Sequence, residues 1–138
     1  MKENLDNVTI ELKVIAVQMG LDIWMQGQLD ILINGAKPYF ESDIINTEIL
    51  LKSLESDGEY FIFSCNCGVP ECSGWIKEIN VTHQGKKIKW MDTNTDRVWY
   101  LDREKIESDL KNIREEVKLF KHYFKEKQIE YVGVGYDW

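Results

Sequence analysis

The sequence predicts an α+β fold: a single domain over residues 1–138, with an antiparallel sheet, a short helix and a long C-terminal amphipathic helix packed on one face. Three observations predict it: apolar residues alternate near the N-terminus, several short strand-like segments follow one another between residues 59 and 101, and a helical apolar stripe begins after residue 103. With 138 residues, the chain can bury a core without help from disulfides or metal.

The first element is a strand over residues 8–17, where Val8, Ile10, Leu12 and Val14 share one face. A second strand is predicted over residues 28–33, and the dipeptide after it, Asn-Gly, is typical of a tight turn.

A short helix is predicted between residues 43 and 55, because its apolar residues follow helical spacing. Asn46 or Thr47 is the expected N-cap, and Ser56-Asp57-Gly58 ends the helix.

A group of strands follows, and the short loops between them predict antiparallel neighbours. The segments are 59–66, 75–83, 87–92 and 97–101. Asp92, Asp96 and Asp102 flank the last hairpin, and turn and N-cap roles explain them more simply than a cation site does.

The long helix is predicted over residues 103–127, with Asp102 as its N-cap. Its apolar stripe favours packing on a sheet over a coiled-coil seam. The stripe consists of Ile106, Leu110, Ile113, Val117, Phe120 and Phe124. The tail that follows is either a final strand or a frayed end.

All three cysteines lie in one stretch, SCNCGVPECSG, residues 64–74. Cys65, Cys67 and Cys72 are therefore the candidate metal ligands, and zinc is the candidate metal. In a regular strand the Cα atoms of Cys65 and Cys67 lie ~6.6 Å apart. Their sulfurs must approach to ~3.8 Å to share a zinc ion, so the backbone has to bend, and Gly68 is the expected place.

Three thiolates leave a tetrahedral zinc site one ligand short. His83 is the obvious fourth candidate, although a regular strand would place it ~26 Å from the cysteine turn. His122 and Glu71 are the other candidates. Two further interpretations stay open: a packed hairpin end with buried cysteines, and a thiol redox site.

The run from Phe63 to Gly74, followed by alternating apolar residues and Lys89-Trp90, resembles a family of small uncharacterised bacterial proteins. Their signature is C-x-C-G-x-x-x-C-x-G between a short helix and a β-hairpin, and the resemblance covers about residues 42 to 110. It implies a common fold and no particular activity. In size and outline these proteins are similar to immunity proteins that neutralise bacterial toxins.

The charge balance bears on the class of partner. The chain has 24 acidic and 17 basic residues, a formal charge of -7, which argues against nucleic-acid binding and favours a basic protein partner. We see neither a signal peptide nor an apolar run of the ~20 residues that span a bilayer, so a cytoplasmic protein is expected. The oligomeric state stays open.

The functional prediction is a non-enzymatic protein-binding module, immunity-like or regulatory. It rests on the acidic charge, the supply of 16 aromatic residues and the lack of a recognisable catalytic motif. The alternative is a zinc-binding protein, or a thiol- or metal-dependent activity, centred on Cys65, Cys67 and Cys72.

Overall fold

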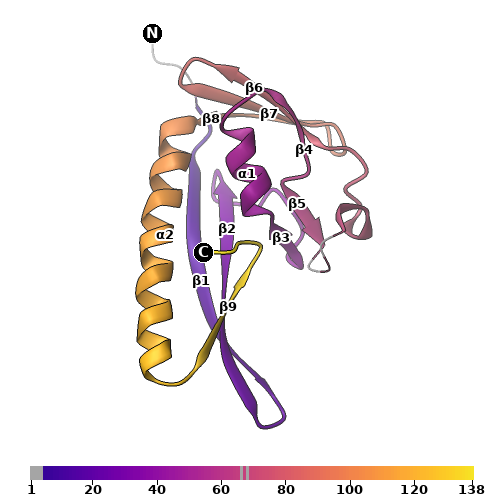
Figure 1. Ribbon diagram of the computed structural model, residues 1–138. Helices are drawn as coiled ribbons and strands as arrows, with labels where there is room; N and C mark the ends of the chain where they lie inside the picture. Colours follow the sequence, from indigo (N-terminus) through magenta and orange to yellow (C-terminus); the bar gives the residue numbers. More distant parts are fainter. Residues whose placement is uncertain (1–4, 66, 68) are drawn as a thin grey trace.

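The structure, a computed structural model, describes residues 5–65, 67 and 69–138. The described chain contains nine strands, two α-helices and one 3-10 turn (Figure 1). Their order is β1 (Val8–Met19), β2 (Asp22–Ile33), β3 (Asp43–Ile45), α1 (Thr47–Ser53), β4 (Gly58–Tyr60), β5 (Phe63–Cys65), η1 (Pro70–Ser73), β6 (Ile79–Gln84), β7 (Lys87–Asp92), β8 (Arg97–Asp102), α2 (Arg103–Glu126) and β9 (Glu130–Val134). The α+β class, with a short helix and a long C-terminal helix, is therefore confirmed.

The strands of the described chain divide among three sheets, where one antiparallel sheet was expected. The strand orders are β1-β2-β9, β3-β5 and β4-β6-β7-β8. The pairs are antiparallel except that β9 runs parallel to β2. The direction of β9 follows from the chain path. α2 carries the chain along β1 toward the end where the β1–β2 hairpin turns, and β9 runs back from the end of α2 (Figure 1).

The β1–β2 hairpin is longer than the sequence suggested. Its pairing is continuous from Val8 opposite Ile33 to Met19 opposite Asp22, so β2 begins six residues before the predicted start at residue 28. Gly27, which directly precedes the predicted start, lies inside the strand opposite Val14. The hydroxyls of Tyr131 and Tyr136, hydrogen-bonded to each other at 2.6 Å, occupy the space where a Cβ at this position would stand.

The predicted strand over 59–66 is two strands in the structure. β4 pairs with β6, whereas β5 turns away and pairs with β3. The predicted strand over 75–83 starts only at Ile79, because Trp75 is withdrawn to hydrogen-bond Asp43 through its indole Nε1 at 2.9 Å. The predicted antiparallel neighbours, 59–66 and 75–83, therefore pair only through β4 and β6. β5, which carries Cys65, pairs with β3 instead.

Both predicted helix caps are present. The Asn46 side chain accepts a hydrogen bond from the N–H of Ile49 at 3.1 Å at the start of α1. The Asp102 side chain accepts from the N–H groups of Glu104 and Lys105 at the start of α2. Each cap satisfies backbone donors that the first helical turn leaves without partners.

The apolar stripe of α2 packs on the sheet rather than forming a coiled-coil seam. Its first four members, Ile106, Leu110, Ile113 and Val117, are buried. Asp109 of the helix accepts the backbone N–H of Ile10 in β1 at 3.0 Å, and Phe124 stacks on Tyr131 of β9 with ring centroids 6.3 Å apart. Figure 1 shows α2 running along β1 for most of that strand.

An aromatic cluster joins the strand that carries Cys65 to the rest of the core. Phe63 of β5 is 1% exposed and lies at its centre. Its ring centroid is 4.7 Å from that of Tyr39, 5.3 Å from Trp75 and 6.0 Å from Trp90. Burial of such rings contributes strongly to stability, so the strand that carries Cys65 is attached to the buried core.

In the described part of the chain, neither helix combines the length with the apolar character that crossing a bilayer requires.

Gly27→Ala tests the contact between β2 and the two tyrosines. The added Cβ would collide with the hydroxyls of Tyr131 and Tyr136, so we expect a loss of ~1–3 kcal/mol in the free energy of unfolding, measured by urea denaturation. In the background of Tyr131→Phe, which removes the nearest hydroxyl, the loss should be smaller. Equal losses in both backgrounds would contradict this packing.

Candidate metal centre

The three cysteines converge in the structure. Cys65 ends β5, Cys67 lies in the turn that follows, and Cys72 belongs to η1. Their Sγ atoms all lie within 4.8 Å of one another. None of these three residues forms a disulfide; Cys65 is half-buried, and Cys67 and Cys72 are exposed.

The two ends of the cysteine loop are held by the same residue. Cys65 pairs with Asp43 in the β3–β5 ladder, and the Asp43 carboxylate accepts the indole N–H of Trp75 at the far end of the loop. Between these points η1 tightens the chain, and Gly74 closes it with a φ of 90° that favours glycine. The bend expected at Gly68 falls outside the described residues.

The pKa values of the Cys65 and Cys72 thiols are shifted in opposite directions. The pKa of Cys65 falls to about 7, because its thiolate accepts hydrogen bonds from the backbone N–H of Cys67 and then from the side chains of Cys67, Cys72 and Ser73. The pKa of Cys72 rises to about 11, because its S–H donates to Cys65 and Cys67 and because their negative charge opposes a further one. The surroundings therefore favour a thiolate at Cys65 and oppose one at Cys72.

Distances allow a zinc ion at this place. Zinc–sulfur bonds of ~2.3 Å put tetrahedral ligands ~3.8 Å apart. Sulfurs within 4.8 Å of one another therefore need to close by about an ångström at most. The three cysteines are a possible metal site, compatible with zinc, as the sequence predicted.

None of the residues proposed from the sequence as the fourth ligand joins the cysteine group. His83 lies on β6, where its ring Nε2 is 2.8 Å from the carbonyl oxygen of Ser53. His122 is on α2 beside Glu126, and Glu71 is exposed in η1. Among the described residues, the group that could hold a metal consists of the three cysteines.

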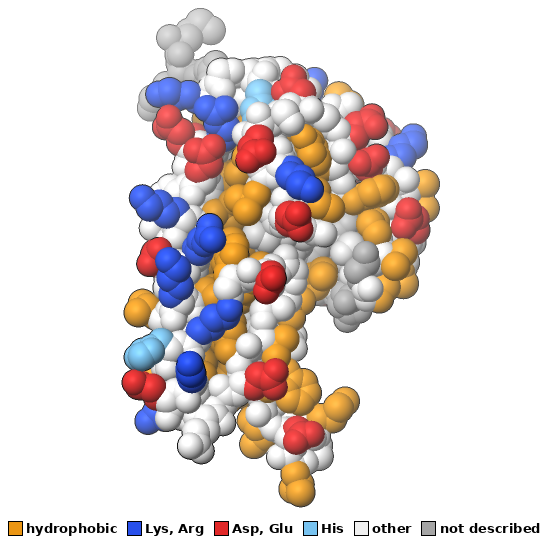
Figure 2. All heavy atoms as spheres, in the orientation of Figure 1, with side chains coloured by type: hydrophobic (Ala, Val, Ile, Leu, Met, Phe, Trp, Pro, Cys, Tyr) orange, Lys and Arg blue, Asp and Glu red, His pale blue; other side chains and the backbone are white. Residues whose placement is uncertain are grey.

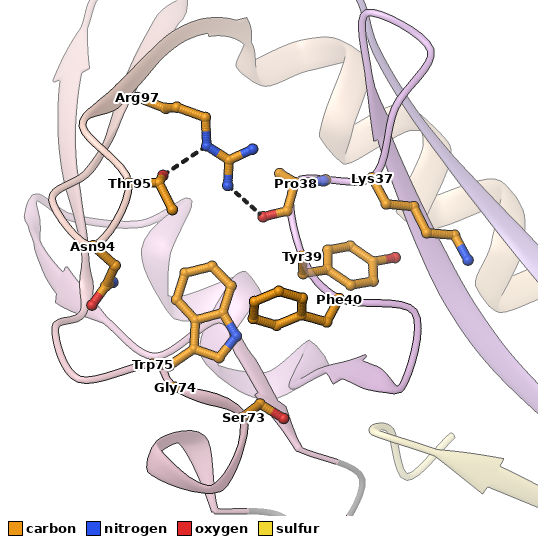
Figure 3. Close-up of a pocket in the computed structure, with 10 residues that line it drawn as sticks. All are labelled: Lys37, Pro38, Tyr39, Phe40, Ser73, Gly74, Trp75, Asn94, Thr95 and Arg97. Atoms are coloured by element: carbon orange, nitrogen blue, oxygen red, sulfur yellow. Dashed lines mark hydrogen bonds between the residues drawn. The ribbon is translucent and has the colours of Figure 1, made fainter.

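Next to the cysteine loop lies an open cavity of about 540 Å³ (Figure 3). Its walls come from three loops, residues 37–40, 73–75 and 94–97. Tyr39, Phe40 and Trp75 supply aromatic rings, and Arg97 closes one side with Nε donating to Thr95 Oγ1 at 2.7 Å and Nη2 to the Pro38 carbonyl at 3.0 Å. Nothing in the sequence pattern marked this cavity, because its walls are far apart along the chain.

Two of the acidic residues that flank the last hairpin, Asp92 and Asp102, have structural roles, as expected. Asp92 is fully buried, and its two oxygens accept hydrogen bonds from Asn94, Thr95 and Arg97. Asp102 caps α2. These carboxylates organise a turn and a helix start.

Comparison of the chain with models of protein families, with curated proteins and with solved structures gives no match. The resemblance to a bacterial family with the C-x-C-G-x-x-x-C-x-G signature stays a prediction.

The ionisation pattern predicts which thiol of the metal-free protein reacts first. Because the pKa of Cys65 is about 7 and that of Cys72 about 11, iodoacetamide at pH 7 should label Cys65 ahead of Cys72, although Cys65 is the less exposed. The Cys65 rate should rise as the pH passes through about 7 and the thiol ionises. Peptide mapping by mass spectrometry measures this order, and earlier labelling of Cys72 would contradict it.

Proposed function

We propose that the protein binds one zinc ion through Cys65, Cys67 and Cys72. The observation that carries the proposal is the convergence of three sulfur atoms to within 4.8 Å of one another. Thiolates are preferred zinc ligands. The pKa of Cys72 is raised by its hydrogen bonds to Cys65 and Cys67 and then by their negative charge, and a bound cation would offset that charge.

The exposure of the thiols supports metal binding over the packed hairpin end. A cysteine that fills space in a core is buried and behaves as a small hydrophobe. Cys67 and Cys72 are exposed, so neither contributes that kind of packing.

A structural role suits this donor set better than a catalytic one. Three thiolates bring three negative charges to a doubly charged ion, which leaves it little capacity to polarise a substrate. The metal would instead hold Cys65 at the end of β5 against Cys72 in η1. Because Trp75 follows this turn and lines the cavity, the metal would also fix one wall of that cavity.

Metal content tests the proposal directly. Native mass spectrometry of protein purified without chelators or a metal-affinity column should find one zinc per chain, and Cys72→Ser should lose it. His83→Ala, a control variant in the residue first suggested as a ligand, should keep it. Zinc at a hundredfold its Kd contributes ~2.7 kcal/mol, so chelation should lower the Tm by roughly 10 °C. A metal-free parent with three titratable thiols would overturn the proposal.

A second proposed function, protein binding, is favoured by the end of the β1–β2 hairpin. We define the hairpin tip as residues 15–25. Its apolar side chains are unusually exposed: Leu21 is 100% exposed, Met19 73% and Ile23 57%. Figure 1 shows the hairpin projecting past the end of α2, and Figure 2 shows hydrophobic side chains gathered on this projection.

The chemistry of the tip suggests the kind of protein surface that would receive it. Asp22 is its single charged residue, although the chain as a whole carries a formal charge of -7. A partner with a narrow apolar groove therefore fits the tip better than the basic surface expected from the net charge. Exposed apolar patches of this kind commonly mark interaction sites.

A matched pair of variants tests the tip. Leu21→Ser alters the tip, and Leu119→Ser alters an exposed leucine of α2, 71% exposed, away from it. In cross-linking from the native source, a partner of the tip should be lost with the first variant, at least tenfold in yield, and retained with the second. Identical cross-linked species for the parent and both variants would contradict a binding role for the tip.

A further inference from the structure

Asp43 is a buried carboxylate whose hydrogen bonds satisfy only one of its two oxygens. Its side chain is 2% exposed. Oδ2 accepts the indole N–H of Trp75 at 2.9 Å and the backbone N–H of Phe40 at 3.2 Å. Oδ1 is buried and has no hydrogen-bond partner among the described residues.

A buried carboxylate oxygen without a partner is costly, because it has lost its water and gained nothing in return. Such groups are normally paired with a cation or bound to a metal. Within the described chain, no lysine or arginine forms an ion pair with Asp43. A cation that the described chain does not itself supply would therefore stabilise the Asp43 carboxylate.

The cysteine group is beside it. Asp43 is the direct antiparallel partner of Cys65. Side chains at directly opposite positions project from the same face of the ladder, with Cβ atoms ~4.5–5.5 Å apart. Asp43 also bonds Trp75, which follows Cys72 by three residues, so it adjoins both ends of the cysteine loop.

We infer that Asp43 is the fourth ligand of the metal held by Cys65, Cys67 and Cys72. This inference rests on the proposed zinc binding. Aspartate oxygen is an accepted zinc ligand, and one more ligand closes a tetrahedral site that has three thiolates. The carboxylate is not within the 4.8 Å group, so coordination requires its side chain to shift toward the sulfurs while Oδ2 keeps its partners.

The same arrangement links the metal to the cavity. Both donors to Oδ2, the Trp75 indole and the Phe40 backbone, belong to residues that line it, as Figure 3 shows. A metal bound through Asp43 would fix the position of that carboxylate, and with it two walls of the cavity. Zinc binding should then change Trp75 fluorescence, and Trp75→Phe should remove most of the change.

Cobalt(II) titration of the parent and two Asp43 variants tests the ligand assignment, because thiolate-to-cobalt absorption counts sulfur ligands. The parent should bind one ion with the intensity of three thiolates. Asp43→Asn should weaken the binding at least tenfold and alter the ligand-field bands. Asp43→Cys should raise the thiolate absorption by about a third, as a fourth sulfur joins the ion.

Asp30→Asn and Asp30→Cys are the matched controls. Asp30 is also a buried carboxylate whose Oδ1 accepts no hydrogen bond, although Lys37 Nζ lies 3.7 Å from that oxygen. It lies in β2, outside the β3–β5 ladder. These variants should leave the cobalt spectrum unchanged. X-ray absorption of the zinc-loaded parent, which does not depend on variants that fold, should find three sulfurs and one oxygen.

The outcomes separate the two claims. A parent that binds no cobalt and no zinc overturns the proposed function, and the assignment of Asp43 with it. A parent that binds the ion while Asp43→Asn matches its affinity and spectrum, or while Asp43→Cys adds no thiolate absorption, overturns the assignment of Asp43 alone. X-ray absorption that finds a nitrogen or a fourth sulfur bound to zinc in the parent also overturns the assignment of Asp43 alone.

Discussion

The hydrogen bond from the Trp75 indole to the Asp43 carboxylate determines the shape of the region that carries the chemistry. It withdraws Trp75 from the strand that follows and places its ring against Phe63. Because Cys65 pairs with Asp43 through the backbone, the chain between Cys65 and Trp75 must close on itself. The meeting of the three cysteines is thus a consequence of how β3 holds both ends of one loop.

Patterns that depend on near neighbours in the chain predicted the structure well. The stripe of α2 follows the helical period of 3.6 residues, and the alternation in β1 follows the strand period of 2. The caps at Asn46 and Asp102 bond backbone groups only two or three residues away. Features set by distant contacts were missed. The place of Gly27 inside β2 is one of them, because nothing near it in sequence reveals the two tyrosine hydroxyls that occupy its side-chain space.

The residues of the candidate site also differ in whether near neighbours in the chain or distant contacts place them. Cys65, Cys67 and Cys72 were predicted because they lie within one short stretch. Asp43 was missed because its place beside Cys65 depends on the register of two three-residue strands, and residue types alone do not determine that register. His83 was proposed because histidine is a common zinc ligand, but its ring faces the Ser53 carbonyl instead.

The parallel pairing of β9 with β2 has a consequence for synthesis on the ribosome. Trp24 pairs with Glu130, a separation of about a hundred residues, and translation at ~5–20 residues per second needs roughly 5–20 s to cover it. For that time one edge of β2 has no partner strand, next to an apolar hairpin tip. The newly made chain is therefore most open to wrong pairing, and most in need of a chaperone, before its last strand emerges.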